Sequence, residues 1–142
     1  MKELDVRGTG LYADGQEILL HTLCGEDGFS LTVTNLGAAA VAMTVDGCDV
    51  LLGFGALSAQ LEKGPMFGAT LGRYAGKICG AHYRQDGREI QLSQSHGGDH
   101  AHGGCRGFDK HIFQTKHLEA DCVCYRYVSP DGEEGYPGTL TL

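Results

Sequence analysis

The chain has 142 residues, of which 42% are hydrophobic and 20% are charged, values typical of one globular domain. The formal net charge of −7 and the lack of a basic cluster with interleaved aromatic residues argue against nucleic acid as a partner. No apolar run reaches the length of a membrane helix, so we expect no membrane partner either.

The amino-terminal residues contain no apolar segment of the kind found in signal peptides. Six cysteines are present, but the chain is not a short secreted scaffold. We therefore predict a cytoplasmic protein whose cysteines are free thiols.

The first elements in chain order are strands, because apolar residues recur with a period of two. Residues Ile18–Leu23 predict one strand. Phe29, Leu31 and Val33 alternate with polar residues and predict a second, half-buried strand. The intervening residues Gly25–Gly28 have the composition of a turn.

Asp-Gly dipeptides then predict two-residue hairpin turns. Asp46-Gly47 lies between Val41–Val45 and Cys48–Leu52, and Asp86-Gly87 lies between Ala81–Gln85 and Arg88–Leu92. A further strand pair is predicted at Ile112–His117 and Cys122–Val128, followed by a turn at Ser129–Gly132. Only Ala56–Leu61 indicates helix, and Met66–Ala75 indicates a loop or an irregular strand. The predicted fold class is all-β, an antiparallel β-sandwich.

The segment from His96 to Lys110 is the strongest candidate for a functional site. It holds three histidines and five glycines in fifteen residues, a mixture that no core strand requires. Glycine allows close approach of the backbone to a ligand, and imidazole exchanges protons near neutral pH. Within it we expect His102 to contact a ligand, and His96 and His100 to be exposed loop residues.

Zinc is an alternative for this segment, with ligands drawn from five side chains: His96, His100, His102, Cys105 and His111. Structural zinc sites use four ligands with paired, regular spacing, and this spacing is loose. We therefore predict no metal and no other cofactor, and expect only adventitious metal binding.

Other chemistry-bearing residues have simpler interpretations. Cys122 and Cys124 are predicted to face one side of a strand, as small apolar core residues. Arg73 is expected to brace the fold through hydrogen bonds. Glu133 and Glu134 could act as a base, but solvation or capping of N–H groups within their own turn is the favoured interpretation.

Five motifs in order resemble those of the aldose 1-epimerase (galactose mutarotase) family. They are Asn35-Leu36-Gly37-Ala38, then Asp49-Val50-Leu51-Leu52-Gly53-Phe54, then Phe67-Gly68-Ala69-Thr70-Leu71-Gly72-Arg73-Tyr74-Ala75, then His102-Gly103-Gly104-Cys105-Arg106-Gly107-Phe108-Asp109-Lys110, and finally Ser129-Pro130-Asp131-Gly132-Glu133-Glu134-Gly135-Tyr136-Pro137-Gly138. The resemblance implies a galactose mutarotase-like supersandwich and interconversion of the α and β anomers of an aldohexose. It covers most of the chain from Asn35 onward and matches the amino-terminal part of the family only, so we expect residues 1–142 to be a partial sandwich and a truncated member.

The resemblance also implies which site residues the chain carries. His102 matches a family histidine that contacts the sugar near its ring oxygen. The family's Asn-Arg pair in the cleft is replaced by Gly76 and Lys77, and Lys lacks the planar fork of Arg. The family's general acid His and general base Glu lie beyond the matched part, so no catalytic residue is assigned here, and His102 and Lys77 are the predicted substrate-binding residues.

Two functions follow from this resemblance. In the first, the chain is an aldose 1-epimerase-like isomerase that acts by acid/base ring opening when a second half completes it. In the second, it is a non-catalytic carbohydrate-binding or oligomeric structural β-domain derived from the family. A partial sandwich exposes strand edges and apolar faces, so both predict self-association or a complementary chain as partner, with an aldohexose as the small-molecule ligand.

Overall fold

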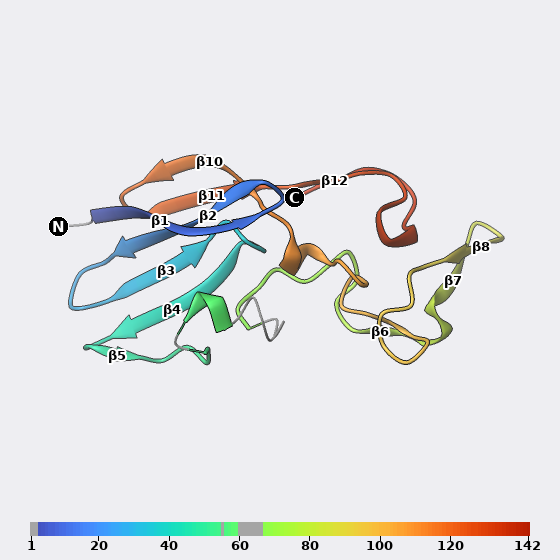
Figure 1. Ribbon diagram of the computed structural model, residues 1–142, viewed down its shortest axis with the longest axis horizontal. Coiled ribbons are helices and arrows are strands. Elements are labelled where there is room, and N and C mark those ends of the chain that lie inside the picture. Colours follow the sequence, from blue (N-terminus) through green and yellow to red (C-terminus); the bar gives the residue numbers. More distant parts are fainter. Residues whose placement is uncertain (1–2, 55, 60–66) are drawn as a thin grey trace.

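The computed structural model describes residues 3–54, 56–59 and 67–142, and its largest element is an antiparallel sheet of five strands (Figure 1). The strands follow chain order across the sheet: β1 (Glu3–Ala13), β2 (Gln16–Cys24), β3 (Ser30–Thr34), β4 (Ala39–Val45) and β5 (Cys48–Asp49). Each strand pairs with the next along the chain, as expected for strands joined by short turns.

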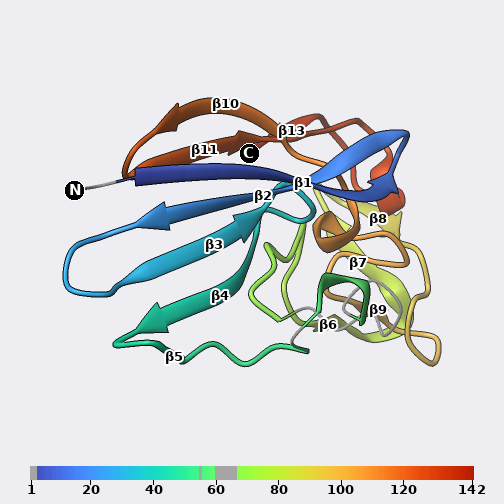
Figure 2. The same ribbon diagram turned by 60° about the vertical axis from the view of Figure 1, so that its left-hand side comes forward.

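The rest of the described chain forms four two-stranded antiparallel ribbons and three short 3-10 turns. The ribbons are β6 (Lys77–Ile78) with β9 (His100–Ala101), β7 (His82–Gln85) with β8 (Arg88–Gln91), β10 (Gln114–Glu119) with β11 (Cys122–Arg126), and β12 (Val128–Ser129) with β13 (Leu140–Thr141). The 3-10 turns are η1 (Cys79–Ala81), η2 (Phe108–Lys110) and η3 (Glu133–Gly135). Figures 1 and 2 show the first two ribbons beyond one end of the five-stranded sheet and the β10–β11 hairpin beside β1 and β2.

The predicted all-β, antiparallel fold class is confirmed, and so are the two Asp-Gly hairpins. Asp46-Gly47 joins β4 to β5 and Asp86-Gly87 joins β7 to β8. All four residues have positive φ, between 48° and 79°, which is the backbone of a type I′ turn. This turn suits the right-handed twist of the flanking strands, and Asp and Gly tolerate the conformation.

Strand β1 is not among the predicted elements. Its sequence contains two glycines and lacks a clean apolar alternation, and the register with β2 shifts between Gly8 and Tyr12. Asp14-Gly15, with φ of 53° and 71°, forms the turn to β2 and is the sequence signal that would have found this hairpin. In the predicted Ala56–Leu61 helical segment, residues 57–59 are helical and residues 60 and 61 lie outside the described part. Residues 67–75 form a loop, as predicted, and Met66 also lies outside the described residues.

Two small clusters of buried apolar side chains form the core. Ile18, Leu36 and Ile112 join the five-stranded sheet to the segment before β10, where Leu36 and Ile112 also form a β-bridge. Ala81, Leu92 and Tyr136 form the second cluster, under the β7–β8 ribbon. None of the described helices is long and apolar enough to cross a membrane.

The β10–β11 hairpin packs on the sheet through a polar contact. The Tyr125 hydroxyl lies 2.7 Å from Nδ1 of His21, whose side chain is almost completely buried on β2. Burial lowers the pKa of His21, which keeps the ring neutral and able to accept this hydrogen bond.

The predicted core location of the Cys122 and Cys124 pair is wrong. Cys124 is exposed and Cys122 is half-buried. Because β11 directs Tyr125 toward His21, the alternate residues Cys122 and Cys124 point away from the sheet. The two thiols do share one side of the strand, with their Sγ atoms 3.8 Å apart, as the period of two predicts.

Candidate functional site

Pairing of β6 with β9 brings the two predicted sugar-binding residues together. Lys77 of β6 lies opposite Ala101 of β9, and His102 follows Ala101 directly. Lys77 is exposed and forms no ion pair with the residues that the structure describes. The backbones of Lys77 and His102 therefore lie close together at the end of one ribbon.

His102 is fixed by the backbone of Gly76. The His102 N–H donates to the Gly76 carbonyl (2.8 Å), and the Gly76 N–H donates to Nδ1 of the imidazole (3.2 Å). Since Nδ1 accepts a hydrogen bond, the neutral ring carries its proton on Nε2. No described residue forms a hydrogen bond with Nε2, so the ring offers one N–H donor to a ligand.

The loop after His102 is held in place by close backbone packing. Gly103 has a φ of +96°, and a Cβ at this position would overlap the carbonyl oxygen of Gly72. The glycine is thus required both by its backbone conformation and by its contact with the Phe67–Ala75 segment.

Glu134 anchors the same loop from a distant part of the chain. Its carboxylate accepts the N–H of Cys105 (2.9 Å) and the N–H of Arg106 (2.8 Å), and the Ser93 hydroxyl donates to it as well. The expected capping of N–H groups is found, but the groups belong to the His102–Lys110 loop and not to the turn of Glu134 itself. Sequence reasoning missed this link because the partners are far apart in the chain.

Glu133 is equally committed to the fold. The hydroxyls of Tyr127 and Ser129 donate to its carboxylate, and Nε2 of His111 lies 3.3 Å from its Oε1. The His111 ring stacks on Tyr127, with centroids 4.7 Å apart. Burial lowers the pKa of His111, and the Glu133 carboxylate opposes this effect only in part. Glu133 is therefore a structural acceptor in the described fold.

Arg73 braces the fold through hydrogen bonds, as predicted, by joining the loop after Phe67 to residues 129–137. Its guanidinium donates to the Ser129 hydroxyl (2.9 Å) and to the carbonyl oxygens of Ser129, Pro130 and Pro137 (3.1, 2.8 and 3.0 Å). The group also lies 5.8 Å from the ring centroid of Tyr136. These contacts use the guanidinium for structure and leave it no free donor pair for a sugar.

The prediction that His100 is exposed is wrong: its side chain is completely buried. Nδ1 lies 2.8 Å from the Ser93 carbonyl, which can only accept, so Nδ1 carries the proton. Nε2 then accepts from the Tyr136 hydroxyl at 2.8 Å. Burial raises the pKa of Tyr136 to about 12, which keeps this hydroxyl a donor. His96 is exposed, as predicted.

The proposed alternative zinc ligands are not gathered around one point. His100 and His102 are engaged with Tyr136 and Gly76, and His111 stacks on Tyr127. Across residues 3–54, 56–59 and 67–142, no group of three or more His, Cys, Asp or Glu side chains is arranged to hold a metal ion.

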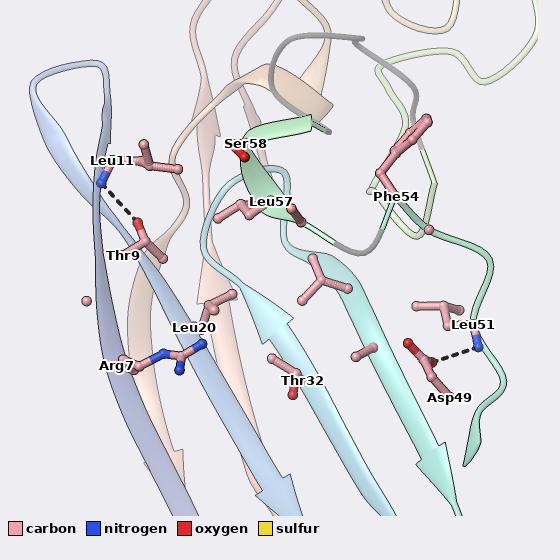
Figure 3. A pocket seen from close by; sticks show the side chains of 15 residues that line it. Arg7, Thr9, Leu11, Leu20, Thr32, Asp49, Leu51, Phe54, Leu57 and Ser58 are labelled. Carbon is pink, nitrogen blue, oxygen red and sulfur yellow. Dashed lines mark hydrogen bonds between the residues drawn. The ribbon is translucent and has the colours of Figure 1, made fainter. Parts of the chain in front are cut away.

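A hollow also lies elsewhere, on the open face of the five-stranded sheet (Figure 3). It has a volume of about 720 Å³ and is lined by residues of β1–β5 and the following segment, among them Arg7, Leu20 and Thr32. Asp49 at its edge accepts the N–H groups of Leu51 and Met43, which lower its pKa. Neither His102 nor Lys77 lines this hollow, so it is not the candidate site.

Comparison with known proteins gives consistent results. A family model described as aldose 1-epimerase matches residues 20–142. Galactose mutarotase from Sus scrofa is 46% identical over 94 residues, which cover 66% of this chain and 27% of that protein. Aldose 1-epimerase from Escherichia coli K12 is 34% identical over 135 residues, covering 92% of this chain and 39% of that protein.

A solved structure supports the fold. The crystal structure of galactose 1-epimerase from Lactobacillus acidophilus NCFM matches with a TM-score of 0.89 at 24% identity, over 99% of this chain and 43% of that one. This likeness shows that the chain has the fold of that epimerase over the matched part. The chain spans well under half the length of each of these relatives.

Proposed function

This chain belongs to the aldose 1-epimerase family, and from that premise we propose that it forms one wall of a sugar cleft in which the α and β anomers of an aldohexose interconvert. The observation that carries the proposal is the contact between His102 and Gly76. It fixes the imidazole on the ribbon next to Lys77 and leaves an Nε2–H donor unused within the described structure.

Mutarotation requires two proton transfers. A base removes the proton of the anomeric hydroxyl while an acid protonates the ring oxygen; the C1–O5 bond breaks, the aldehyde rotates, and the ring closes on the other face. In this proposal the His102 Nε2–H donates to the sugar near the ring oxygen, where negative charge develops. The Lys77 ammonium supplies a second donor on the same wall.

The acid and the base come from outside this wall. The family resemblance assigns them to a His and a Glu beyond the residues that match here, so we propose that the second half of the family fold supplies both. The present residues then bind and orient the sugar, and proton transfer belongs to the complementary part.

A non-catalytic sugar-binding or structural role is the second candidate, and one observation favours it. Gly76 has a φ of +119°, a backbone conformation that disfavours other residues, and it stands where the family resemblance places an Asn. Lys77 likewise stands where the resemblance places an Arg. Compared with that Asn-Arg pair, this wall lacks one side-chain amide and one planar guanidinium group.

Titration of the folded chain with D-galactose, followed by the ring-proton NMR signals of its histidines, tests sugar binding at this wall. We expect the His102 signals to shift and those of exposed His96 to stay unchanged. A His102→Ala variant should lose most of the affinity, whereas a His96→Ala control should keep it. Absence of any shift at His102 with galactose or glucose would reject the sugar site.

Polarimetry separates the two candidates. The change in optical rotation of freshly dissolved α-D-galactose is measured with this chain and a complementary segment that carries the family's second half. For an isomerase, we expect a faster change than with the segment alone, and we expect His102→Ala to remove this increase. Sugar binding without acceleration assigns the non-catalytic role.

A further inference from the structure

Cys122 and Cys124 are two cysteines whose sulfur atoms are in contact. All six cysteines of the chain lie in its described part, and within that part this is the one contact between thiols, with the Sγ atoms 3.8 Å apart. Residues two apart on a strand direct their side chains to the same face, which brings the two thiols of β11 together. We call these two side chains the β11 dithiol.

The β11 dithiol lies on the side of the hairpin that faces away from the five-stranded sheet. Tyr125, which alternates with the two cysteines, points inward to His21. Cys124 is exposed and Cys122 is half-buried. The side chain of Glu119, directly opposite Cys122 on β10, is 60% exposed. A small molecule can therefore reach the Cys124 sulfur without any opening of the core.

The surroundings distinguish the two thiols. The hydrogen bond with Cys124 raises the pKa of Cys122, and so do the charge of Cys124, partial burial and the carboxylates of Glu119 and Asp121. Cys122 therefore keeps its proton when the dithiol loses one, and the exposed Cys124 carries the negative charge. Because the thiolate is the nucleophile in thiol chemistry, Cys124 is the sulfur that attacks first.

The backbone of β11 allows the two sulfur atoms to join. Disulfides connect Cα atoms about 4.4 to 6.8 Å apart, and residues two apart on a strand are about 6.6 Å apart. This separation is near the upper limit, so a bond here is strained and is easily reduced again. Cys122 is the first residue of β11, and its pairing with Glu119 is the last before the turn, so the backbone can shift there without disturbing the sheet.

We propose that the β11 dithiol is oxidised reversibly by low-molecular-weight disulfides. The Cys124 thiolate attacks one sulfur of the small disulfide, forms a mixed disulfide and releases a thiolate, which takes up a proton from solvent. Cys122 then loses its proton to solvent and attacks the Cys124 sulfur, which releases the second small thiol. Two protein thiols are thus oxidised to one disulfide, and one small disulfide is reduced to two thiols.

The contact between the two sulfur atoms decides which product remains. Because Cys122 touches Cys124, the second step is intramolecular and removes the mixed disulfide quickly. Cys79 is exposed in η1 and contacts no other thiol of the described chain, so there the same reagent leaves a lasting adduct. The β11 dithiol is on a different ribbon from His102, and the proposal does not depend on the proposed sugar function.

Mass spectrometry of the reduced full chain after treatment with bis(2-hydroxyethyl) disulfide, a neutral reagent, tests the proposal. Trypsin cleaves after lysine and arginine, so residues 117–126 form a peptide with both cysteines of the dithiol, and residues 78–84 form a peptide with Cys79 alone. We expect the first peptide to lose two hydrogen atoms and the second to carry the adduct. Dithiothreitol should restore both.

Serine variants assign the two steps. Cys122→Ser should leave a lasting adduct on Cys124, about tenfold or more above the level on this peptide in the unchanged chain. Cys124→Ser should prevent the loss of two hydrogen atoms. Cys79→Ser is the matched control, and its 117–126 peptide should react as in the unchanged chain.

Circular dichroism of each variant verifies that the chain remains folded, which these positions at the surface favour. A lasting adduct on the 117–126 peptide of the unchanged chain would overturn the proposal, since Cys122 would then fail to attack. So would an unmodified 117–126 peptide under conditions that modify Cys79 completely. A disulfide from Cys124 to any cysteine other than Cys122 would overturn it as well.

Discussion

The two regions of this molecule are stabilised in different ways. Residues 3–49 form a sheet held by a continuous backbone ladder, and its strands follow one another in chain order. Residues 67–142 form short ribbons whose relative positions depend on side chains that reach distant backbone groups, such as Arg73 to Pro130 and Glu134 to Arg106. In the first region the backbone ladder carries most of the order, whereas in the second the identity of single side chains decides the geometry.

Charged residues within a family motif have different roles in this fold. Glu133 and Glu134 are candidates for a base in the sequence, but each accepts several hydrogen bonds from the fold. Arg73, expected to brace the fold, is engaged in the same way. His102 differs because only Nδ1 is used and Nε2–H is left for a ligand. A group with an unused donor is a better candidate for binding than a group with many partners.

The largest expected effect on stability comes from adding a methyl group where two backbone segments are in close contact. Gly103→Ala places a methyl group on the Gly72 carbonyl in a left-handed conformation and should cost about 4 kcal/mol or more of unfolding free energy. Gly53→Ala, in the segment after β5, meets only the Val41 carbonyl at 3.8 Å and should change little. Urea unfolding followed by circular dichroism measures both, and equal midpoints would show that the close contact of Gly103 with Gly72 does not limit stability.

A smaller effect is expected from one side chain of the second region. Glu134→Gln replaces one carboxylate oxygen by an amide nitrogen, which cannot accept a hydrogen bond from Cys105 or Ser93. We expect a loss of about 2 kcal/mol in unfolding free energy and a weaker galactose-induced shift at His102. Glu26→Gln, at an exposed turn of the sheet, is the control and should lie within about 0.5 kcal/mol of the unchanged chain.

Low pH should destabilise both regions, because each contains a buried histidine. Burial lowers the pKa of His21 in the sheet and of His111 in the second region. As the pH falls, these two histidines are protonated in the unfolded chain before they are protonated in the folded chain. Their contribution to the stability of the fold is therefore complete above about pH 6.5 and decreases as the pH drops below it. Calorimetric melting between pH 5 and 7.5 should show a flatter profile for His21→Gln and for His111→Gln, but not for exposed His96→Gln.

The smallest effect concerns sugar affinity alone. Lys77→Arg gives the ribbon a planar donor fork that can bind two sugar oxygens at once, and Lys77 is exposed, so stability should not change. We expect galactose affinity to rise about threefold, which corresponds to about 0.7 kcal/mol. Lys116→Arg on β10 is the control, and unchanged affinity in Lys77→Arg would show that this side chain does not touch the sugar.

Much of the fold was predictable because its signals are local. Period-two alternation at Leu31 and Val33 and the turns at Asp46-Gly47 and Asp86-Gly87 depend on neighbouring residues only. β1 was missed because its own residues alternate poorly and its pairing with β2 stabilises it. Cys124 was assigned to the core because period two gives the spacing of a face but not which face is buried.

The sequence by itself determined the fold class, the family motifs and the pair of candidate binding residues, since those follow from local periodicity and from motif order. Only the tertiary structure decided what each polar side chain does. His100 became a core residue through Tyr136, and Glu134 became the anchor of a loop that lies 28 residues away from it. Burial and hydrogen-bond partners depend on contacts between distant segments, and these are set when the chain folds.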